Sequence, residues 1–305
     1  MRPPASSGPQ STGNPGPEGS RAAAFPSGKG KDRVPFITVI VSTYNRPHEL
    51  WGVLRSLSNQ TVRDFEIVVA DDGSGQETAQ VVSEWQKVAN GRLLHVWHED
   101  TGFRLAEIRN RAIAASHGEY VVFLDGDCIP SRDFVARHTR LAQRGWMVCG
   151  HRLMLTKTLT DEVLRDRLPI EEWTLWNWVR QFRRGTIDRF QPMLRLPGQA
   201  WRRRTTKGRP NKVRGCNMAV WRTDLVKVDG FDAELVGWGH EDNDLATRLE
   251  LVGVKLKDGR WATGVYHLWH ELADRTNEDE HWKWITHVKA TGRATPRRGL
   301  SSLQP

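Results

Sequence analysis

Cysteine and long apolar runs are both scarce in this sequence. Its 305 residues contain only Cys128, Cys149 and Cys216, which are too few and too scattered for a disulfide framework or a zinc cluster and fit a reducing compartment best. No segment approaches the ~20 uninterrupted apolar residues that a membrane-spanning helix needs. The N-terminus also lacks the apolar core of a secretory signal. We therefore expect a soluble, cytoplasmic protein.

A glycine-rich nucleotide turn is missing as well. The segment STYNRPHEL (42–50), which links the first predicted strand to the first predicted helix, contains no glycine. A dinucleotide-dependent dehydrogenase is expected to carry G-x-G-x-x-G at this place. This absence argues against that class of enzyme.

Basic residues and tryptophan, by contrast, are abundant. Lysine and arginine number 45 against 36 acidic residues, so the net charge of +9 favours an anionic partner such as nucleic acid, an anionic lipid surface or a phosphorylated small molecule. Charge alone does not choose among these partners. The 14 tryptophans exceed the three tyrosines, and such side chains fill either a core or a flat binding platform.

Short apolar runs alternate with helical patterns over residues 36–124. The runs at 36–42, 65–70, 92–97 and 119–124 are nearly continuous in apolarity, which is typical of parallel strands covered on both faces. Helices are predicted at 47–58, 76–89 and 104–116. This series predicts an α/β fold with a mostly parallel, Rossmann-like sheet, helices on both faces, and a ligand beyond the carboxyl ends of the strands.

The rest of the chain is less regular. Residues 1–33 are rich in proline, glycine and serine and predict a disordered tail. The alternation stops over 151–212, which we interpret as an insertion or a mobile loop, and eight basic residues without an acid fall between Arg195 and Arg214. Strand character resumes at 213–221, a helix is predicted at 241–252, and 293–305 resemble a flexible basic end.

Asp125-Gly126-Asp127 follows the fourth predicted strand and forms an Asp-x-Asp (DXD) pattern. Residues i and i+2 share a face in extended chain, and two carboxylates held together favour a divalent cation such as Mg²⁺ or Mn²⁺. The alternative is a simple turn, because Asp-Gly is a common turn pair.

The ends of the first two strands also carry polar side chains. Ser42 and Tyr44 follow the first strand, and Asp71 and Asp72 follow the second. An aromatic ring there could stack on a nucleobase and a carboxylate could accept its hydrogen bonds, although side chains of this kind also cap helices.

Arg109 lies on the apolar side of the helix predicted at 104–116. A guanidinium that faces inward needs an anionic or planar partner. A nucleotide would supply one, and so would an internal salt bridge to an acid such as Asp71.

The run Gly237-Trp238-Gly239-His240-Glu241-Asp242 leads into a helix that begins with acids. Acids in a first turn also complement the helix dipole, but the flexible aromatic approach favours a pocket floor, with Asp242 as the candidate base. Downstream, His267 and His270 stand three apart at a strand end, where either could complete the metal shell that Asp127 begins.

In this order, VSTYNRP, DDGS, FRLAEIRNRAI, FLDGDC and GWGHEDNDL resemble the GT-A-fold glycosyltransferases of family 2. The second half is similar to the acceptor region of β-1,4-galactosyltransferases and of bacterial chondroitin-type polymerases. The resemblance covers about 36–290 and implies a nucleotide-sugar-binding half over 34–150 and an acceptor-binding, catalytic half over 213–292.

The resemblance also implies roles for individual residues. On the nucleotide side, it places Tyr44 and Asp72 on the nucleobase with Ser42 and Asp71 beside them, Arg109 near the nucleotide and Asp125 on the ribose side. Asp127 would bind a manganese or magnesium ion together with His267 or His270. Asp242 would be the catalytic base, beside the acceptor-binding Glu241. Trp238 and Trp201 could stack on sugar faces. His240 stands where the galactosyltransferases carry glycine.

The implied activity is an inverting transfer from a nucleoside-diphosphate sugar, with UDP-sugar the first expectation, to a glycan or glycolipid acceptor in cell-surface polysaccharide synthesis. One base suffices, because a metal ion can absorb the charge of the leaving diphosphate, whereas a glycoside hydrolase needs an acid as well. Peripheral contact with an anionic membrane is left open. The alternative is a basic protein that binds single-stranded nucleic acid, which ranks lower because no nucleic-acid motif accompanies the charge.

Overall fold

A computed structural model describes residues 34–303 except 90, 190–212, 261 and 272–275. The predicted N-terminal tail, Trp201 and all of the basic stretch up to residue 212 therefore lie outside the described residues.

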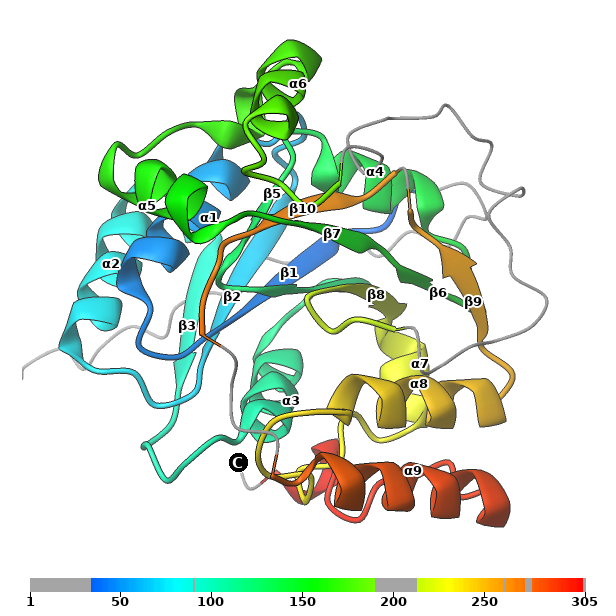
Figure 1. Ribbon diagram of the computed structural model, residues 1–305. Coiled ribbons are helices and arrows are strands. Elements are labelled where there is room, and N and C mark those ends of the chain that lie inside the picture. The colour runs from blue at the N-terminus through cyan, green and yellow to red at the C-terminus, as the bar shows by residue number, and fades with distance from the viewer. Residues whose placement is uncertain (1–33, 90, 190–212, 261, 272–275, 304–305) are drawn as a thin grey trace, which may run out of the picture. The chain divides into compact units, whose positions relative to one another are not determined.

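The centre of the fold is a seven-stranded sheet with the order β3-β2-β1-β4-β8-β6-β9 (Figure 1). Its strands are β1 (Ile37–Thr43), β2 (Phe65–Asp71), β3 (Leu93–Trp97), β4 (Tyr120–Asp125), β6 (Trp146–Cys149), β8 (Asn217–Trp221) and β9 (Lys255–Asp258). Strands β1 to β4 are parallel, whereas β8 is antiparallel to its neighbours β4 and β6. The predicted mostly parallel α/β fold is confirmed.

The four strands predicted over 36–124 lie within one residue of β1 to β4, whereas the strand predicted at 213–221 begins only at Asn217. All seven residues of β1 and of β2 are buried, because helices cover both faces of the sheet. A continuous β-branched apolar run is the pattern that such strands require, and it is visible in the sequence alone.

Helices lie on the two faces of the sheet (Figure 1). One face carries α1 (Pro47–Ser58), α2 (Gln76–Val88), α4 (Phe134–Leu141), α5 (Lys157–Arg165), the 3₁₀ helix η1 (Ile170–Glu172) and α6 (Leu175–Arg183). The other carries α3 (Leu105–Ala115), α7 (Arg222–Lys227), α8 (Glu241–Leu251), α9 (Glu278–Thr291) and η5 (Leu300–Ser302). Each face has its own apolar core, with Leu50 and Val122 in the first and Ile108 and Phe123 in the second.

A second, three-stranded sheet brings a late segment to the end of β4. Its order is β5 (Cys128–Pro130), β10 (Gly264–His267) and β7 (His151–Met154). β10 is antiparallel to β5, and their register pairs His267 with Cys128. The sheet therefore places His267 beside the residue that follows Asp127.

The expected interruption over 151–212 is partly regular structure, because the described residues 151–189 form β7, α5, η1 and α6. The expected loose end over 293–305 also differs from the structure. Arg298 donates a hydrogen bond to Glu107 on α3, and the backbone N–H of Ser301 donates one to Asp229. The basic residues of this segment are typical of a flexible tail, but hydrogen bonds to buried or partly buried acids elsewhere in the chain fix it on the fold. The division into 34–150 and 213–292 remains a prediction, although β4 of the first pairs with β8 of the second.

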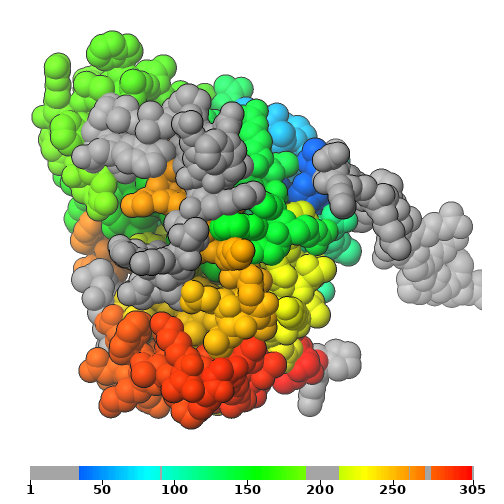
Figure 2. Space-filling view, turned by 90° about the vertical axis from the view of Figure 1, so that its right-hand side faces the viewer, coloured from blue at the N-terminus to red at the C-terminus, as the bar shows by residue number. Residues whose placement is uncertain are grey.

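Helix α9 and the segment after it lie over the lower part of the face seen in the space-filling view (Figure 2). Among the helices of the described residues, none is long and apolar enough to cross a membrane.

Candidate functional site

The DXD turn is held against the end of β1. The N–H of Gly126 donates a hydrogen bond of 2.7 Å to the carbonyl of Ser42, and a Cβ at this position would lie 2.8 Å from the same oxygen. Only glycine allows this approach without movement of the backbone. It separates Asp125, the last residue of β4, from Asp127.

Asp127 is a largely buried carboxylate among cationic or neutral nitrogen groups. His270 Nε2 lies 3.2 Å from its Oδ2, His267 Nε2 lies 3.7 Å from its Oδ1, and an Arg46 nitrogen lies 3.8 Å from Oδ2. Burial by itself would raise the pKa of Asp127, but the hydrogen bond with His270 and the charges around the carboxylate lower it to about 2. Asp127 is therefore anionic at neutral pH.

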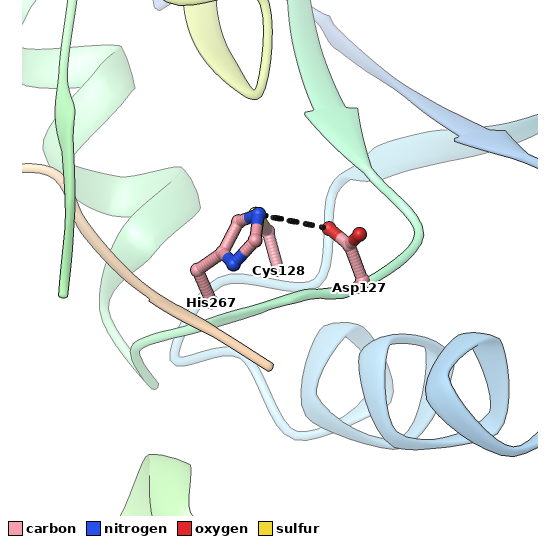
Figure 3. A group of neighbouring side chains, drawn as sticks. All are labelled: Asp127, Cys128 and His267. Atoms are coloured by element: carbon pink, nitrogen blue, oxygen red, sulfur yellow. Dashed lines mark hydrogen bonds and ion pairs between the residues drawn. The ribbon is translucent and has the colours of Figure 1, made fainter. Parts of the chain in front are cut away.

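The groups around Asp127 match the donors that bind divalent cations. Figure 3 shows the imidazole of His267 directed toward the carboxylate of Asp127, with Cys128 beside them. One ligand atom from each of these three residues lies within 4.8 Å of the others. Burial lowers the pKa of His267 to about 4, so its imidazole is neutral and has a lone pair to offer. Carboxylate, imidazole and thiol together fit a divalent metal ion.

Cys128 is a neighbour that the sequence did not predict, because three scattered cysteines do not by themselves indicate a metal site. Its Sγ lies 3.4 Å from Asp127 Oδ1, and burial raises the pKa of its thiol. Its position directly after the DXD pattern was the available signal.

Arg109 connects the two ends of the site. The side chain is 1% exposed, and it donates from Nε to Ser42 Oγ at 3.1 Å, from Nη1 to Glu241 Oε1 at 3.0 Å and from Nη2 to Asp125 Oδ1 at 2.9 Å. Of the two alternatives for its partner, the structure contains the internal salt bridge, with Asp125 and Glu241 in place of Asp71. The two DXD carboxylates have different partners, because Asp125 contacts Arg109 while Asp127 lies beside the two histidines.

Asp125 feels charges from both ends of the site. Burial and the negative charges of Asp127 and Glu241 raise the pKa of Asp125, Arg109 acts in the opposite direction, and the resulting pKa is about 6. The DXD turn and the first turn of α8 therefore belong to one electrostatic environment.

Asp242 lies in the first turn of α8 in a different setting. Its Oδ2 accepts a 2.7 Å hydrogen bond from the N–H of Gly215, and its Oδ1 accepts one of 2.8 Å from Asn243. Burial, followed by the negative charge of Glu241, raises the pKa of Asp242 to about 7. A carboxylate with that pKa can take up a proton near neutral pH.

The approach to α8 is a loop of positive φ angles. Gly237 and Gly239 have φ of 92° and 109°, and His240 has φ of 70°, in the region that favours glycine. The conformation of His240 agrees with the glycine that the resemblance places there in galactosyltransferases. Trp238 is partly buried within this loop.

The second strand end is held together by hydrogen bonds that the sequence did not predict. Asp71 accepts from the N–H of Ser74 and contacts His95 Nε2 at 2.9 Å. Asp72 contacts His98 Nε2 at 2.6 Å and accepts from the N–H of Arg104. Both carboxylates thus shape the turn, but neither caps α2, whose N-cap residue Gly75 has no side-chain cap hydrogen bond.

Tyr44 is the accessible member of this group. It is 44% exposed, and its hydroxyl donates a 2.8 Å hydrogen bond to Asp100. Asp100 and the two histidines that contact Asp71 and Asp72 were missed, although the polar segment after the third predicted strand was the signal. The structure thus brings Ser42, Arg109, Asp125 and Glu241 into direct contact, gathers Asp127 with His267 and His270, and keeps Tyr44 beside the second strand end.

Two family models match the chain. The model described as "Glycosyl transferase family 2" matches residues 38–206, more than half of the chain, and the model described as "N-terminal domain of galactosyltransferase" matches residues 200–271. Chondroitin synthase of Escherichia coli is 26% identical over 265 residues, which cover 80% of this chain and 36% of the relative. Validoxylamine A glucosyltransferase of Streptomyces hygroscopicus subsp. jinggangensis (strain 5008) is 30% identical over 250 residues, which cover 76% of this chain and 55% of the relative.

Solved structures share the fold. The mannosyltransferase PcManGT from Pyrobaculum calidifontis, in complex with GDP-Man and Mn²⁺, has a TM-score of 0.54 at 20% identity and covers 86% of this chain and 74% of its own. GalNAc-T7, with UDP, GalNAc and Mn²⁺, has a TM-score of 0.59 at 18% identity and covers 85% and 48%. The chain spans about a third to a half of the length of the curated relatives named above.

Proposed function

Since the chain belongs to glycosyl transferase family 2, we propose that it transfers a sugar with inversion from a nucleoside-diphosphate donor, with UDP-sugar the first candidate, to a hydroxyl of a glycan or glycolipid. The fold is that of GT-A glycosyltransferases, two of which were solved with Mn²⁺ and nucleotide ligands. A role in cell-surface polysaccharide synthesis is part of the proposal, supported by the similarity to chondroitin synthase.

The observation that carries the proposal is the buried contact of Arg109 with both Asp125 and Glu241. Asp125 is two residues from the candidate metal ligand Asp127, and Glu241 is next to the candidate base Asp242. An inverting transferase needs its donor and its proton acceptor in one site, on opposite sides of the reacting carbon. This salt bridge ties the elements that carry the two groups to each other.

In the proposed reaction, Asp242 accepts the proton of the acceptor hydroxyl while the hydroxyl oxygen attacks the anomeric carbon. The bond from that carbon to the diphosphate oxygen breaks, and its electron pair leaves with the diphosphate. Glu241 and Trp238 hold the acceptor sugar, while Ser42, Tyr44, Asp71, Asp72 and Asp125 lie on the nucleotide side. Arg109 orients Asp125 and Glu241.

Asp127, His267 and His270 would hold a Mn²⁺ or Mg²⁺ ion, and the donor set around Asp127 suits such an ion. When bound, the ion neutralises charge on the diphosphate. Cys128 would lie at the edge of that set. The alternative of single-strand nucleic-acid binding relied on a basic stretch of which residues 195–212 lie outside the described residues, and no described feature favours it.

The test is a thermal-shift panel of nucleoside diphosphates and nucleotide sugars, each with and without Mn²⁺. A ligand that binds the folded state raises the melting temperature, and we expect a metal-dependent rise with one nucleotide family. Candidate donors selected in this way then enter a transfer assay with glycan acceptors, in which the anomeric configuration of the product is read by NMR. No metal-dependent shift with any nucleotide, or a product with retained configuration, would contradict the proposal.

A further inference from the structure

Helix α6 presents large apolar side chains to solvent. Trp176 is 80% exposed, and Leu175 and Phe182 are each 49% exposed. Figure 1 shows α6 standing out from the rest of the fold, on the far side of the small sheet from the seven-stranded sheet. Exposed aromatic and aliphatic groups that cluster on a single element point to a binding surface.

The opposite side of α6 is firmly anchored. Trp178 is 2% exposed, and its ring stacks on that of Tyr266 with centroids 4.5 Å apart. A capping box joins Thr174 to Asn177 at the first turn. The helix is therefore formed before any partner arrives, and its exposed side chains do not have to be ordered by folding on contact.

The same exposed face is basic. Trp176, Arg180 and Arg183 recur at i, i+4 and i+7, which places them on one side of a helix. No acid occurs between Leu175 and Arg184. Arg184 pairs with Glu162, whereas Arg180 and Arg183 form no ion pair within the part of the chain that the structure describes.

We propose that α6 docks the protein on an anionic lipid surface. Tryptophan prefers the boundary between headgroups and acyl chains, and guanidinium groups bind lipid phosphates. The anchored helix α6, with arginine beside tryptophan, leucine and phenylalanine, supplies both the apolar contact with the lipid and the attraction to its phosphates. Single-stranded nucleic acid fits less well. Proteins hold it in a basic groove with aromatic side chains for base stacking, whereas α6 protrudes and is better suited to a flat membrane surface.

This surface does not depend on the proposed sugar transfer, since none of its residues belongs to the site. Docking would hold the enzyme near a lipid-linked acceptor, and that consequence alone depends on the proposed function. Vesicle binding and transfer are therefore measured separately.

The experiment measures co-sedimentation of the full chain with vesicles of phosphatidylcholine alone and of equal parts phosphatidylcholine and phosphatidylglycerol. We expect partitioning into the anionic vesicles only. R180E/R183E should reduce it by at least about thirtyfold, because each arginine near the surface contributes about a factor of five and each new glutamate repels the anionic lipids. Trp176→Ala should reduce it by a smaller factor and should abolish the blue shift of tryptophan fluorescence on binding.

The matched control is K283E/K289E, which makes the same change of charge at exposed positions on α9, across the sheet from α6. It should keep most of the vesicle binding, and all variants should keep the melting temperature and the transfer rate with a soluble acceptor. Equal losses in both double variants, or α6-dependent binding of single-stranded oligonucleotide without vesicle binding, would overturn the proposal. Absence of transfer in the unmodified protein would leave it standing and contradict only the proposed function.

Discussion

Asp127 in the DXD turn and Asp242 in the first turn of α8 are both partly buried carboxylates, but the charges around them differ in sign. His267, His270 and Arg46 surround Asp127, and its pKa falls to about 2. Burial and the negative charge of the neighbouring Glu241 disfavour the ionised form of Asp242, and its pKa rises to about 7. Burial acts in the same direction on both, so the hydrogen bond with His270 and the charges of the neighbours decide the difference.

This difference separates two chemical tasks. A carboxylate that stays anionic can hold a cation at any physiological pH, whereas one that titrates near neutrality can accept and release a proton. The contacts of Arg109 hold the end of β4 and the first turn of α8 together, while the pKa values of Asp127 and Asp242 stay far apart.

The largest effect is expected for Asp242→Asn. Loss of the proton acceptor should lower kcat by about 10²–10⁴, because general-base catalysis contributes on that order. Binding of the donor and the metal, measured by calorimetry, should not change. Asp279→Asn, which alters an acid in the first turn of α9, is the matched control. Normal turnover in the Asp242 variant would remove the base assignment.

Asp127→Asn should affect metal binding, whereas Asp242→Asn should affect proton transfer. Removal of the anionic ligand should weaken Mn²⁺ binding, and with it metal-dependent nucleotide binding, by more than the roughly tenfold to hundredfold that loss of a hydrogen-bond partner of a ligand costs. Calorimetry with Mn²⁺ alone measures the effect without turnover, and Asp64→Asn at an exposed site is the control. Unchanged Mn²⁺ affinity would place the ion elsewhere.

The two histidines should differ in a smaller effect. His267 is buried with a pKa lowered to about 4, whereas Asp127 raises the pKa of the half-buried His270. A neutral imidazole binds metal without first losing a proton, so His267→Ala should weaken Mn²⁺ binding at pH 6 more than His270→Ala does. Metal titration of both variants at pH 6 and pH 8 decides this, and the reverse order would assign the ligand to His270.

The smallest effect is a displacement of the pH profile by Glu241→Gln. A base must be deprotonated, so kcat should fall as the pH drops through about 7, the pKa of Asp242. Glu241 raises that pKa, and its replacement by a neutral amide should move the acidic limb to lower pH. A limb that stays in place would mean that another group controls it. The KM for the acceptor, measured in the same series, reports any loss of sugar binding.

The elements that predict well from sequence are those whose pattern is local. The strands β1 to β4 and the helices α1, α3 and α8 were expected within one residue of their observed ends, because burial on one or both sides shapes the order of residues within each element. The position of Asp125 and Asp127 at a strand end follows from the same pattern.

The contacts between distant segments could not be predicted. Nothing near Arg109 in the sequence indicates Glu241 as its partner, and Cys128 gained its neighbour His267 only through the register of β5 with β10. The antiparallel direction of β8 and the contacts of Arg298 with Glu107 have the same origin. Each depends on pairing across many residues, for which a single sequence carries no periodic signal.

By itself, the sequence determined the parallel strands, the helices between them and the acidic residues at their ends, because apolar periodicity is a property of neighbouring residues. The tertiary structure decided which of those acidic residues have a lowered pKa and which have a raised one. That choice depends on the charges that other segments bring within a few ångströms in a buried environment, and only the folded chain fixes those distances.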